Sequence, residues 1–109
     1  MKLRKNIIIA QKKLTEYLLV VKKRNDKSQW LAKAGYILEN WKKLEKDLRE
    51  QILSIDAMPT ESTEYGQTYE IRGKLFGTNG KSIAVCTIWM KESATKETKF
   101  ITMYPDKRE

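Results

Sequence analysis

The sequence predicts an α+β domain, with three N-terminal helices packed on one face of a C-terminal antiparallel sheet of three to four strands. Apolar residues recur at helical spacing in the first half, whereas apolar and polar residues alternate in the second half around an Asn-Gly turn. The 109 residues suffice for one domain. We therefore expect a single domain over residues 1–109, with a helical half (1–55), a linker (56–64) and a sheet half (65–105).

The first expected helix covers residues 11–21. Its apolar positions fall at i, i+3, i+4 and i+7, which is one face of an α-helix, and they are Leu14, Tyr17, Leu18 and Val21. The run Ile7 to Ile9 before it fits either a short strand at a sheet edge or a buried lead-in, and the sequence leaves both open.

Two further helices are expected before the linker. A short one covers residues 27–34, with Asp26 as its N-cap and Gly35 at the C-terminal position that favours a positive φ. The longest covers residues 40–53. Its apolar stripe predicts packing on a core and comprises Trp41, Leu44, Leu48 and Ile52.

The sheet half begins with a hairpin around Asn79-Gly80, which predicts a two-residue type I′ turn. This register places Phe76 opposite Ile83 and Tyr69 opposite Met90. Because side chains alternate across a strand, each residue is then assigned to a face. The expected core face carries Tyr69, Ile71, Leu75, Ala84, Cys86, Ile88 and Met90. The expected open face carries Glu70, Arg72, Lys74, Thr87 and Trp89, with Phe76, Ile83 and Val85 near the turn.

A last strand is expected over residues 99–104, before Pro105. The same alternation places Ile101 and Met103 on the core face. The open face then also receives Phe100, Thr102 and Tyr104.

Composition excludes several classes of site. The chain has no histidine, which excludes a histidine general base, a Ser-His-Asp triad and the usual histidine zinc sites. Cys86 is the one cysteine, so no internal disulfide forms. We expect no cofactor and no metal.

No apolar run approaches the roughly 18 residues of a membrane span. We therefore expect no membrane association and a cytoplasmic protein, or a module of a larger effector.

The net charge of +8 is concentrated in the first half. Residues 1–54 contain 14 Lys and Arg against 6 Asp and Glu, whereas residues 55–109 contain 8 of each. A positive field of this kind attracts polyanions. The alternative is that the charge only keeps the protein soluble. The basic run from Lys22 to Lys27 fits a phosphate-binding loop or a solvated turn. Arg24 and Lys27 are its candidate nucleic-acid-binding residues.

The residues of the open face suit RNA cleavage. Glu70 could remove the 2′-hydroxyl proton, Arg72 and Lys74 could stabilise charge on phosphorus, and Tyr104 or Lys74 could protonate the leaving oxygen. Thr102 could bind a phosphate oxygen. Trp89, with Thr87 beside it, could stack a base.

The structural alternative is a solvated sheet face. Glu70 and Arg72 could simply pair with each other. Trp89 and Phe100 could form a cross-strand aromatic pair.

The order of several short motifs resembles a family of small bacterial domains associated with polymorphic toxins. The motifs span nearly the whole chain: Lys13-Leu14-x-x-Tyr17-Leu18-Leu19, Lys27 before Trp30, Gly35-Tyr36, Leu44 and Leu48, Tyr65-Gly66-x-x-Tyr69-x-Ile71, Gly77-x-Asn79-Gly80, Ile88-Trp89 and Phe100-Ile101-Thr102-x-Tyr104-Pro105.

The layout is also similar to the fold shared by barnase, colicin E5 and RelE-type toxins. This resemblance implies a ribonuclease-like domain with functional positions at Lys27, Trp89, Thr102 and Tyr104. Barnase-like and EndoU-like members use histidine, which this chain lacks. The resemblance therefore leaves open the colicin E5 and RelE style, which works without histidine.

Three hypotheses follow. The first is a metal-independent endoribonuclease of toxin type. The second is a non-catalytic module that binds RNA or an acidic antitoxin or immunity protein through the same face. The third is a structural dimerisation domain in which Trp89, Phe100 and Tyr104 are buried against a second copy, so both a monomer and a homodimer remain open.

Overall fold

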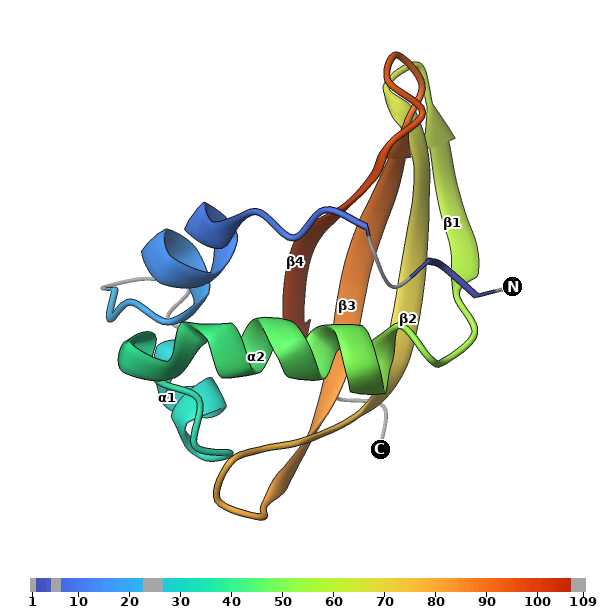
Figure 1. Cartoon of the computed structure of the whole chain (residues 1–109). Coiled ribbons are helices and arrows are strands. Elements are labelled where there is room, and N and C mark those ends of the chain that lie inside the picture. The colour runs from blue at the N-terminus through green and yellow to red at the C-terminus, as the bar shows by residue number, and fades with distance from the viewer. Residues whose placement is uncertain (1, 5–6, 23–26, 107–109) are drawn as a thin grey trace.

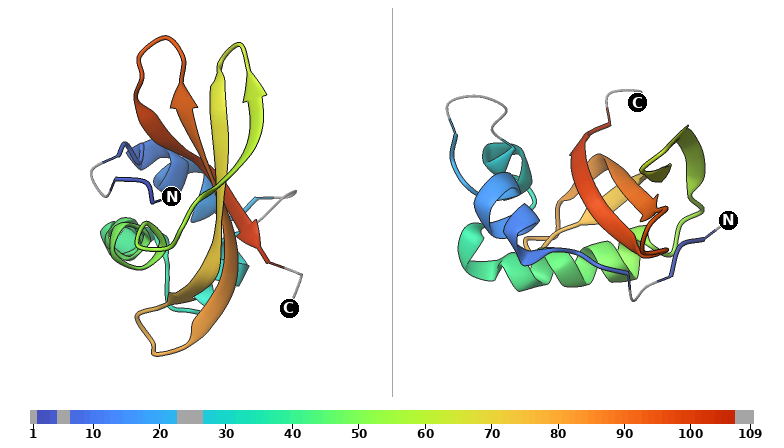
Figure 2. Two further views of the ribbon diagram at one scale, coloured as in Figure 1. Left: turned by 90° about the vertical axis from the view of Figure 1, so that its right-hand side faces the viewer. Right: turned by 90° about the horizontal axis from the view of Figure 1, so that it is seen from above.

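The computed structural model describes residues 2–4, 7–22 and 27–106. Helices cover one face of a four-stranded antiparallel sheet, which confirms the predicted α+β class (Figure 1). Seen from above, the sheet curls and the helices lie together on one side of it (Figure 2). Within these ranges no helix is long and apolar enough to cross a membrane.

The helical layer begins with the π-helix η1 (Lys13–Leu18). Its backbone bonds span five residues, as in the 3.0 Å bond from the Leu19 N–H to the Leu14 carbonyl. The spacing expected for an α-helix therefore does not hold along its whole length. Leu14 and Leu18 are buried, but Tyr17 is 59% exposed and Val21 75% exposed. The prediction that these two side chains lie in the core is wrong.

The remaining helices follow the expected order. Helix α1 (Ser28–Ala32) is short and leads to Gly35, whose φ of +87° confirms the expected C-terminal position. The 3-10 turn η2 (Leu38–Asn40), α2 (Trp41–Asp47) and the π-helical end η3 (Leu48–Ile52) then follow without a break. Their apolar stripe packs on the sheet, with three side chains fully buried: Leu44, Leu48 and Ile52.

The four strands occur in sheet order β1-β2-β3-β4. They are β1 (Met58–Thr63), β2 (Gly66–Phe76), β3 (Ser82–Glu92) and β4 (Thr98–Pro105). Most of the expected linker is therefore strand β1. Its threonines suit a strand, and the Thr60 and Thr68 hydroxyl oxygens lie 2.7 Å apart across the β1–β2 pair.

The β2–β3 hairpin has a different register from the predicted one. Phe76 pairs with Ser82, and Tyr69 pairs with Trp89. A three-residue loop replaces the type I′ turn: the Gly77 N–H donates to the Lys81 carbonyl at 2.9 Å, and Gly80 adopts a φ of +83°. This is a type I turn followed by a left-handed glycine. A type I′ turn would also have required a positive φ at Asn79, which Asn79 does not have.

The shift of one residue turns every β3 side chain to the opposite face. Val85, Thr87 and Trp89 face the helices and are buried, where the sequence had placed Ala84, Cys86 and Ile88. Strand β2 keeps its predicted orientation, with Ile71 and Leu75 in the core.

A bulge changes the orientation of β4. Trp89 pairs with Phe100 but Ile88 pairs with Thr102, so Ile101 is an additional residue without its own partner. Phe100 therefore faces the core and packs edge-on against Trp89, with ring centroids 5.1 Å apart. Met103 is buried as expected, and Thr102 lies on the face away from the helices.

The N-terminal segment adds to the outer edge of β4. Ile8 forms a parallel bridge to Lys99, with backbone hydrogen bonds of 3.1 Å to Thr98 and 2.8 Å from Phe100. Ile7 and Ile9 on either side are buried. Both expectations for this run therefore hold in part, because one residue extends the sheet while its neighbours fill the core.

Candidate functional site

The sheet face away from the helices brings together the five residues predicted to act in catalysis. In the observed register one cross-strand row joins Glu70, Ile88 and Thr102, and the next joins Arg72, Cys86 and Tyr104. Lys74 is exposed and lies two residues beyond Arg72 along β2. We call these five residues the outer-face cluster: Glu70, Arg72, Lys74, Thr102 and Tyr104.

Thr87 and Trp89 do not belong to this face. Both are fully buried on the core side. The Trp89 indole N–H donates to the Thr87 hydroxyl at 2.8 Å, and this hydroxyl donates to the Ile71 carbonyl at 3.0 Å. The prediction that they contact nucleic acid is wrong, because the register shift places them inside.

The surface expected for dimerisation also changes. Trp89 and Phe100 already pair within the core of one chain, as the cross-strand alternative expected. Tyr104 alone of the three remains at the surface, with 37% of its area exposed. An aromatic surface built from all three residues is therefore not available to a second copy.

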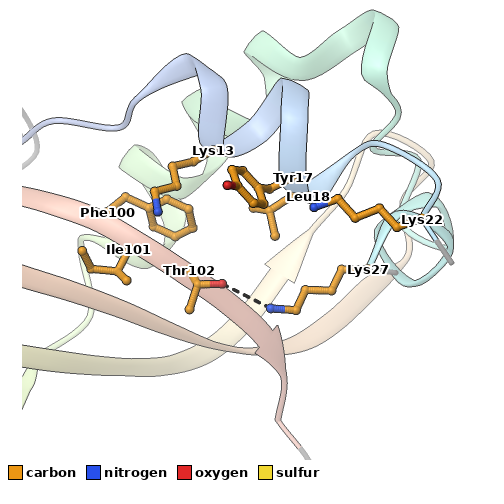
Figure 3. Close-up of a pocket in the computed structure, with 8 residues that line it drawn as sticks. All are labelled: Lys13, Tyr17, Leu18, Lys22, Lys27, Phe100, Ile101 and Thr102. Carbon is orange, nitrogen blue, oxygen red and sulfur yellow. Dashed lines mark hydrogen bonds between the residues drawn. The ribbon is translucent and has the colours of Figure 1, made fainter. Parts of the chain in front are cut away.

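A pocket of about 370 Å³ lies between η1 and β4 (Figure 3). We call it the Lys27 pocket, and its lining residues are Lys13, Tyr17, Leu18, Lys22, Lys27, Phe100, Ile101 and Thr102. The Lys27 ammonium donates to the Thr102 hydroxyl at 3.2 Å (Figure 3). Its nitrogen also lies 5.9 Å from the centre of the Tyr104 ring, so the pocket adjoins the outer-face cluster.

The Lys27 pocket is strongly cationic. Three ammonium groups border it, and none of the described residues that line it is acidic. The Lys22 nitrogen lies 4.0 Å from the centre of the Tyr17 ring, and the Lys13 nitrogen lies 5.8 Å from it. Burial lowers the pKa of Lys27, and the charge of Lys22 lowers it further. The charge of an anion bound in the pocket would oppose both effects and raise the pKa of Lys27.

Arg72 is held between two carboxylates. Its Nε lies 2.6 Å from Glu70 Oε1, and its Nη1 lies 2.7 Å from Asp106 Oδ1. The hydrogen bond with Glu70 raises the pKa of Arg72, and both carboxylate charges add to this effect. The ion pair that the structural alternative expected is therefore present. Arg72 is directed at protein carboxylates, and it fixes the position of Glu70.

Tyr104 keeps its proton more strongly than an ordinary tyrosine. A hydrogen bond with Cys86 raises the pKa of Tyr104, with burial and the nearby charge of Glu70 acting in the same direction. Burial likewise raises the pKa of Cys86, which is a free, buried thiol. At neutral pH the Tyr104 hydroxyl is therefore protonated and hydrogen-bonded to Cys86, while the Tyr104 ring lies beside Lys27.

The structure brings together Lys27, Thr102 and Tyr104, which are three of the four positions that the resemblance named, whereas the fourth, Trp89, is buried in the core. Arg24 lies outside the described residues. Sequence reasoning missed Lys13, Tyr17 and Lys22, because α-helical spacing assigned Tyr17 to the core. Their signal was an aromatic residue with a lysine four positions before it and another five positions after it.

The chemistry available here is that of cations, a phenol, a hydroxyl and one carboxylate. Across the described ranges, no group of three or more histidine, cysteine, aspartate or glutamate side chains is placed to hold a metal ion. The arrangement suits recognition of a phosphate or carboxylate and transfer of a proton to or from a bound ligand.

Comparison with known proteins finds a family model that matches the sequence and a solved chain of similar fold. No curated protein matches the chain. A solved chain from the "Contact-dependent growth inhibition toxin - immunity protein complex from Klebsiella pneumoniae 342" is similar in fold, with a TM-score of 0.69 over 93% of this chain and 94% of that chain, at 16% sequence identity. The family model described as "Domain of unknown function (DUF6883)" matches residues 2–107, and the chain therefore belongs to this family.

Proposed function

We propose that the chain is a toxin-type endoribonuclease domain that cleaves RNA without a metal ion and holds its substrate at the Lys27 pocket. One observation carries this proposal. Lys27 lies among cations at the pocket, is hydrogen-bonded to Thr102, and lies 5.9 Å from the ring centre of Tyr104, whose hydroxyl is protonated at neutral pH. A chain of similar fold occurs in a complex of a toxin with an immunity protein, which fits a role on either side of such a complex.

Phosphate binding is the first step of the proposed activity. A phosphodiester bound beside Lys27 and Thr102 would give the ammonium group a counter-charge that none of the described pocket residues supplies. The Thr102 hydroxyl accepts a hydrogen bond from the Lys27 ammonium at 3.2 Å and can donate its own hydrogen to a phosphate oxygen. Lys13 and Lys22 would bind the neighbouring backbone, while Tyr17 offers an exposed ring to a base.

Cleavage would use the cross-strand neighbours of this site. The ribose 2′-oxygen attacks phosphorus as Glu70 removes its proton. The bond from phosphorus to the 5′-oxygen then breaks, and Tyr104 donates a proton to the leaving oxygen. The products are a 2′,3′-cyclic phosphate and a 5′-hydroxyl.

Glu70 and Thr102 are two strand spacings apart, or roughly 10 Å, which leaves room for a phosphodiester. Lys27 stabilises the charge that develops on the phosphoryl oxygens.

A second candidate is a protein-binding module. Its supporting observation is that the similar solved chain comes from a complex of a toxin with an immunity protein. In this case carboxylates of an acidic partner would occupy the Lys27 pocket. Binding would be salt-sensitive and without RNA turnover.

An RNA cleavage assay with EDTA present distinguishes the ribonuclease from the protein-binding module. We expect wild type to cleave total RNA and to leave cyclic phosphate ends. Glu70→Gln and Tyr104→Phe should each reduce the rate about 100-fold but retain RNA binding, since Tyr104→Phe keeps its ring beside Lys27. Lys27→Ala should lose binding.

Lys46→Ala is the matched control, because it removes one exposed lysine on α2, away from the pocket. Absence of wild-type cleavage, or equal cleavage by all variants, would refute the ribonuclease proposal. Salt-sensitive binding to an acidic protein without turnover would support the binding module in its place.

A further inference from the structure

A second basic pocket, of about 520 Å³, lies where the N-terminal segment crosses the far end of the sheet. Its cationic side chains are Lys2, Arg4, Lys91 and Lys96, and Glu97 is the acidic residue that the structure places among its lining residues. Tyr69 contributes an aromatic ring to it. We call it the Lys96 pocket.

Lys96 has a backbone conformation that favours glycine. Its φ is +64°, the one positive φ found at a non-glycine residue in the described part of the chain. It lies in the β3–β4 turn, where its N–H donates to the Glu92 carbonyl at 2.9 Å. A lysine at this position costs conformational energy that a glycine would not. The Lys96 side chain lines the pocket.

The two pockets are neighbours along one strand. Thr98 lines the Lys96 pocket, and Thr102 lines the Lys27 pocket. Thr98 and Thr102 are four positions apart on β4, which is at most about 13 Å at the rise of a regular strand. The N-terminal segment fixes their relative position through the hydrogen bonds of Ile8 with Thr98 and Phe100.

Both pockets are positively charged, so a single polyanion could occupy the two together. Seven cationic side chains and one carboxylate are found among the described residues that line them. Each pocket also has a tyrosine, Tyr17 in one and Tyr69 in the other. Alternating cations and aromatic rings are the pattern that binds unpaired nucleotides.

We propose that the Lys96 pocket is a second phosphate site and that the substrate is a single-stranded RNA stretch that extends from the Lys27 pocket across the N-terminal segment at Ile8 to the Lys96 pocket. This inference rests on the proposed function and specifies its substrate. Stacking on Tyr17 requires a base that is free of its duplex partner, so a single strand fits better than a duplex.

Binding of labelled RNA by fluorescence anisotropy tests the inference. Two single strands are compared, a dinucleotide and an oligomer of about ten nucleotides. In the Lys91→Ala/Lys96→Gly variant, affinity for the oligomer should fall about 10-fold, and the salt slope should fall by about 1.4 for two lost contacts. Dinucleotide affinity should not change. The glycine is chosen because it accepts the positive φ of Lys96.

Lys46→Ala/Lys81→Ala is the control, since it removes the same charge from exposed positions outside both pockets. Oligomer binding by Lys91→Ala/Lys96→Gly that equals wild type would overturn the second site. Equally tight wild-type binding of a duplex of the same length would overturn the single-stranded substrate. Both results leave the proposed function standing, whereas failure of wild type to bind RNA of any length would refute the function itself.

Discussion

The Lys27 ammonium lies 3.2 Å from the Thr102 hydroxyl oxygen, although 75 positions separate the two residues in the chain. This contact joins the segment before α1 to strand β4 and forms one side of the Lys27 pocket. It also brings Lys27 to 5.9 Å from the Tyr104 ring centre. The helical and sheet halves therefore contribute jointly to the candidate site.

The titration of Lys27 predicts that RNA binding weakens at alkaline pH. Burial and Lys22 lower the pKa of Lys27 below its ordinary value of 10.5, so its ammonium group loses its charge at a lower pH than that of an unperturbed lysine. Affinity measured by anisotropy should fall as pH rises through this lowered pKa. Lys27→Arg stays charged there and should show a smaller fall. Equal pH profiles for the two proteins would contradict the role of Lys27 charge.

Removing Lys22 should raise the pKa of Lys27 and weaken RNA binding. In Lys22→Gln the pKa of Lys27 moves back towards 10.5, because a repelling charge is lost. The pH at which RNA affinity declines should therefore move upward, whereas affinity at neutral pH should fall because the pocket has one cation fewer. Anisotropy measured at several pH values gives both changes, and an unchanged alkaline decline would contradict the repulsion.

The buried chain from Trp89 to Thr87 to Ile71 should be structural. Thr87→Val removes the acceptor of the indole N–H and the donor to the Ile71 carbonyl. We expect a loss of about 1–3 kcal/mol in the free energy of unfolding, because a buried polar group is left unsatisfied. Thr87→Ser keeps the hydroxyl and is the matched control. RNA binding should be unchanged at temperatures where the variant is folded, and a selective loss of binding would contradict the core assignment.

The helix stripe and most of the outer-face cluster could be predicted from the sequence because they depend on local periodicity. Leu44, Leu48 and Ile52 recur every four residues, and all three are buried. Glu70 and Arg72 keep their predicted face because their strand did not shift. Thr102 keeps its face because the bulge at Ile101 reverses the orientation of Phe100 instead.

The strand register, the exposure of Tyr17 and the Lys27 pocket could not be predicted, because a change of one residue in a loop or in a helical turn decides the first two and a long-range contact the third. One residue at the Asn79-Gly80 turn decides the register, and with it the faces of Thr87 and Trp89. The π-helical winding of η1 exposes Tyr17, and this change of period has no distinct local signal. The Lys27 pocket also depends on a contact between distant segments, which periodicity does not encode.

The observed hairpin loop predicts unequal effects of two glycine substitutions. Gly80 has a φ of +83°, and a Cβ there would meet nothing within 4 Å. Gly80→Ala should therefore cost about 1 kcal/mol, from backbone conformation alone. A Cβ on Gly77 would collide with the Ala34 carbonyl, which is backbone and cannot move aside. Gly77→Ala should cost clearly more, as measured by thermal or urea unfolding. Equal costs would contradict the packing of this loop on the segment after α1.

The buried pair of Tyr36 and Asp47 predicts a loss of stability that depends on pH. The Tyr36 hydroxyl donates to Asp47 Oδ2 at 2.6 Å and lies 3.1 Å from the Phe76 carbonyl oxygen, and both side chains are buried. Tyr36→Phe should cost about 1–3 kcal/mol at neutral pH, because one oxygen of a buried carboxylate loses its donor. Lys43, which binds the other Asp47 oxygen at 2.9 Å, should keep the variant folded.

The pH dependence of this pair has a definite sign. Burial raises the pKa of Tyr36, and the hydrogen bond and charge of Asp47 raise it further. The unfolded chain releases the phenol proton near the ordinary tyrosine pKa of 10.0, while the folded chain retains it. The stabilisation is therefore complete below this value and declines as pH rises above it. Urea unfolding of wild type and Tyr36→Phe in parallel should give a stability difference that is constant from neutral pH to about 9 and then narrows. A difference that stays constant into strongly alkaline solution would mean that the Tyr36 hydroxyl is not held by Asp47.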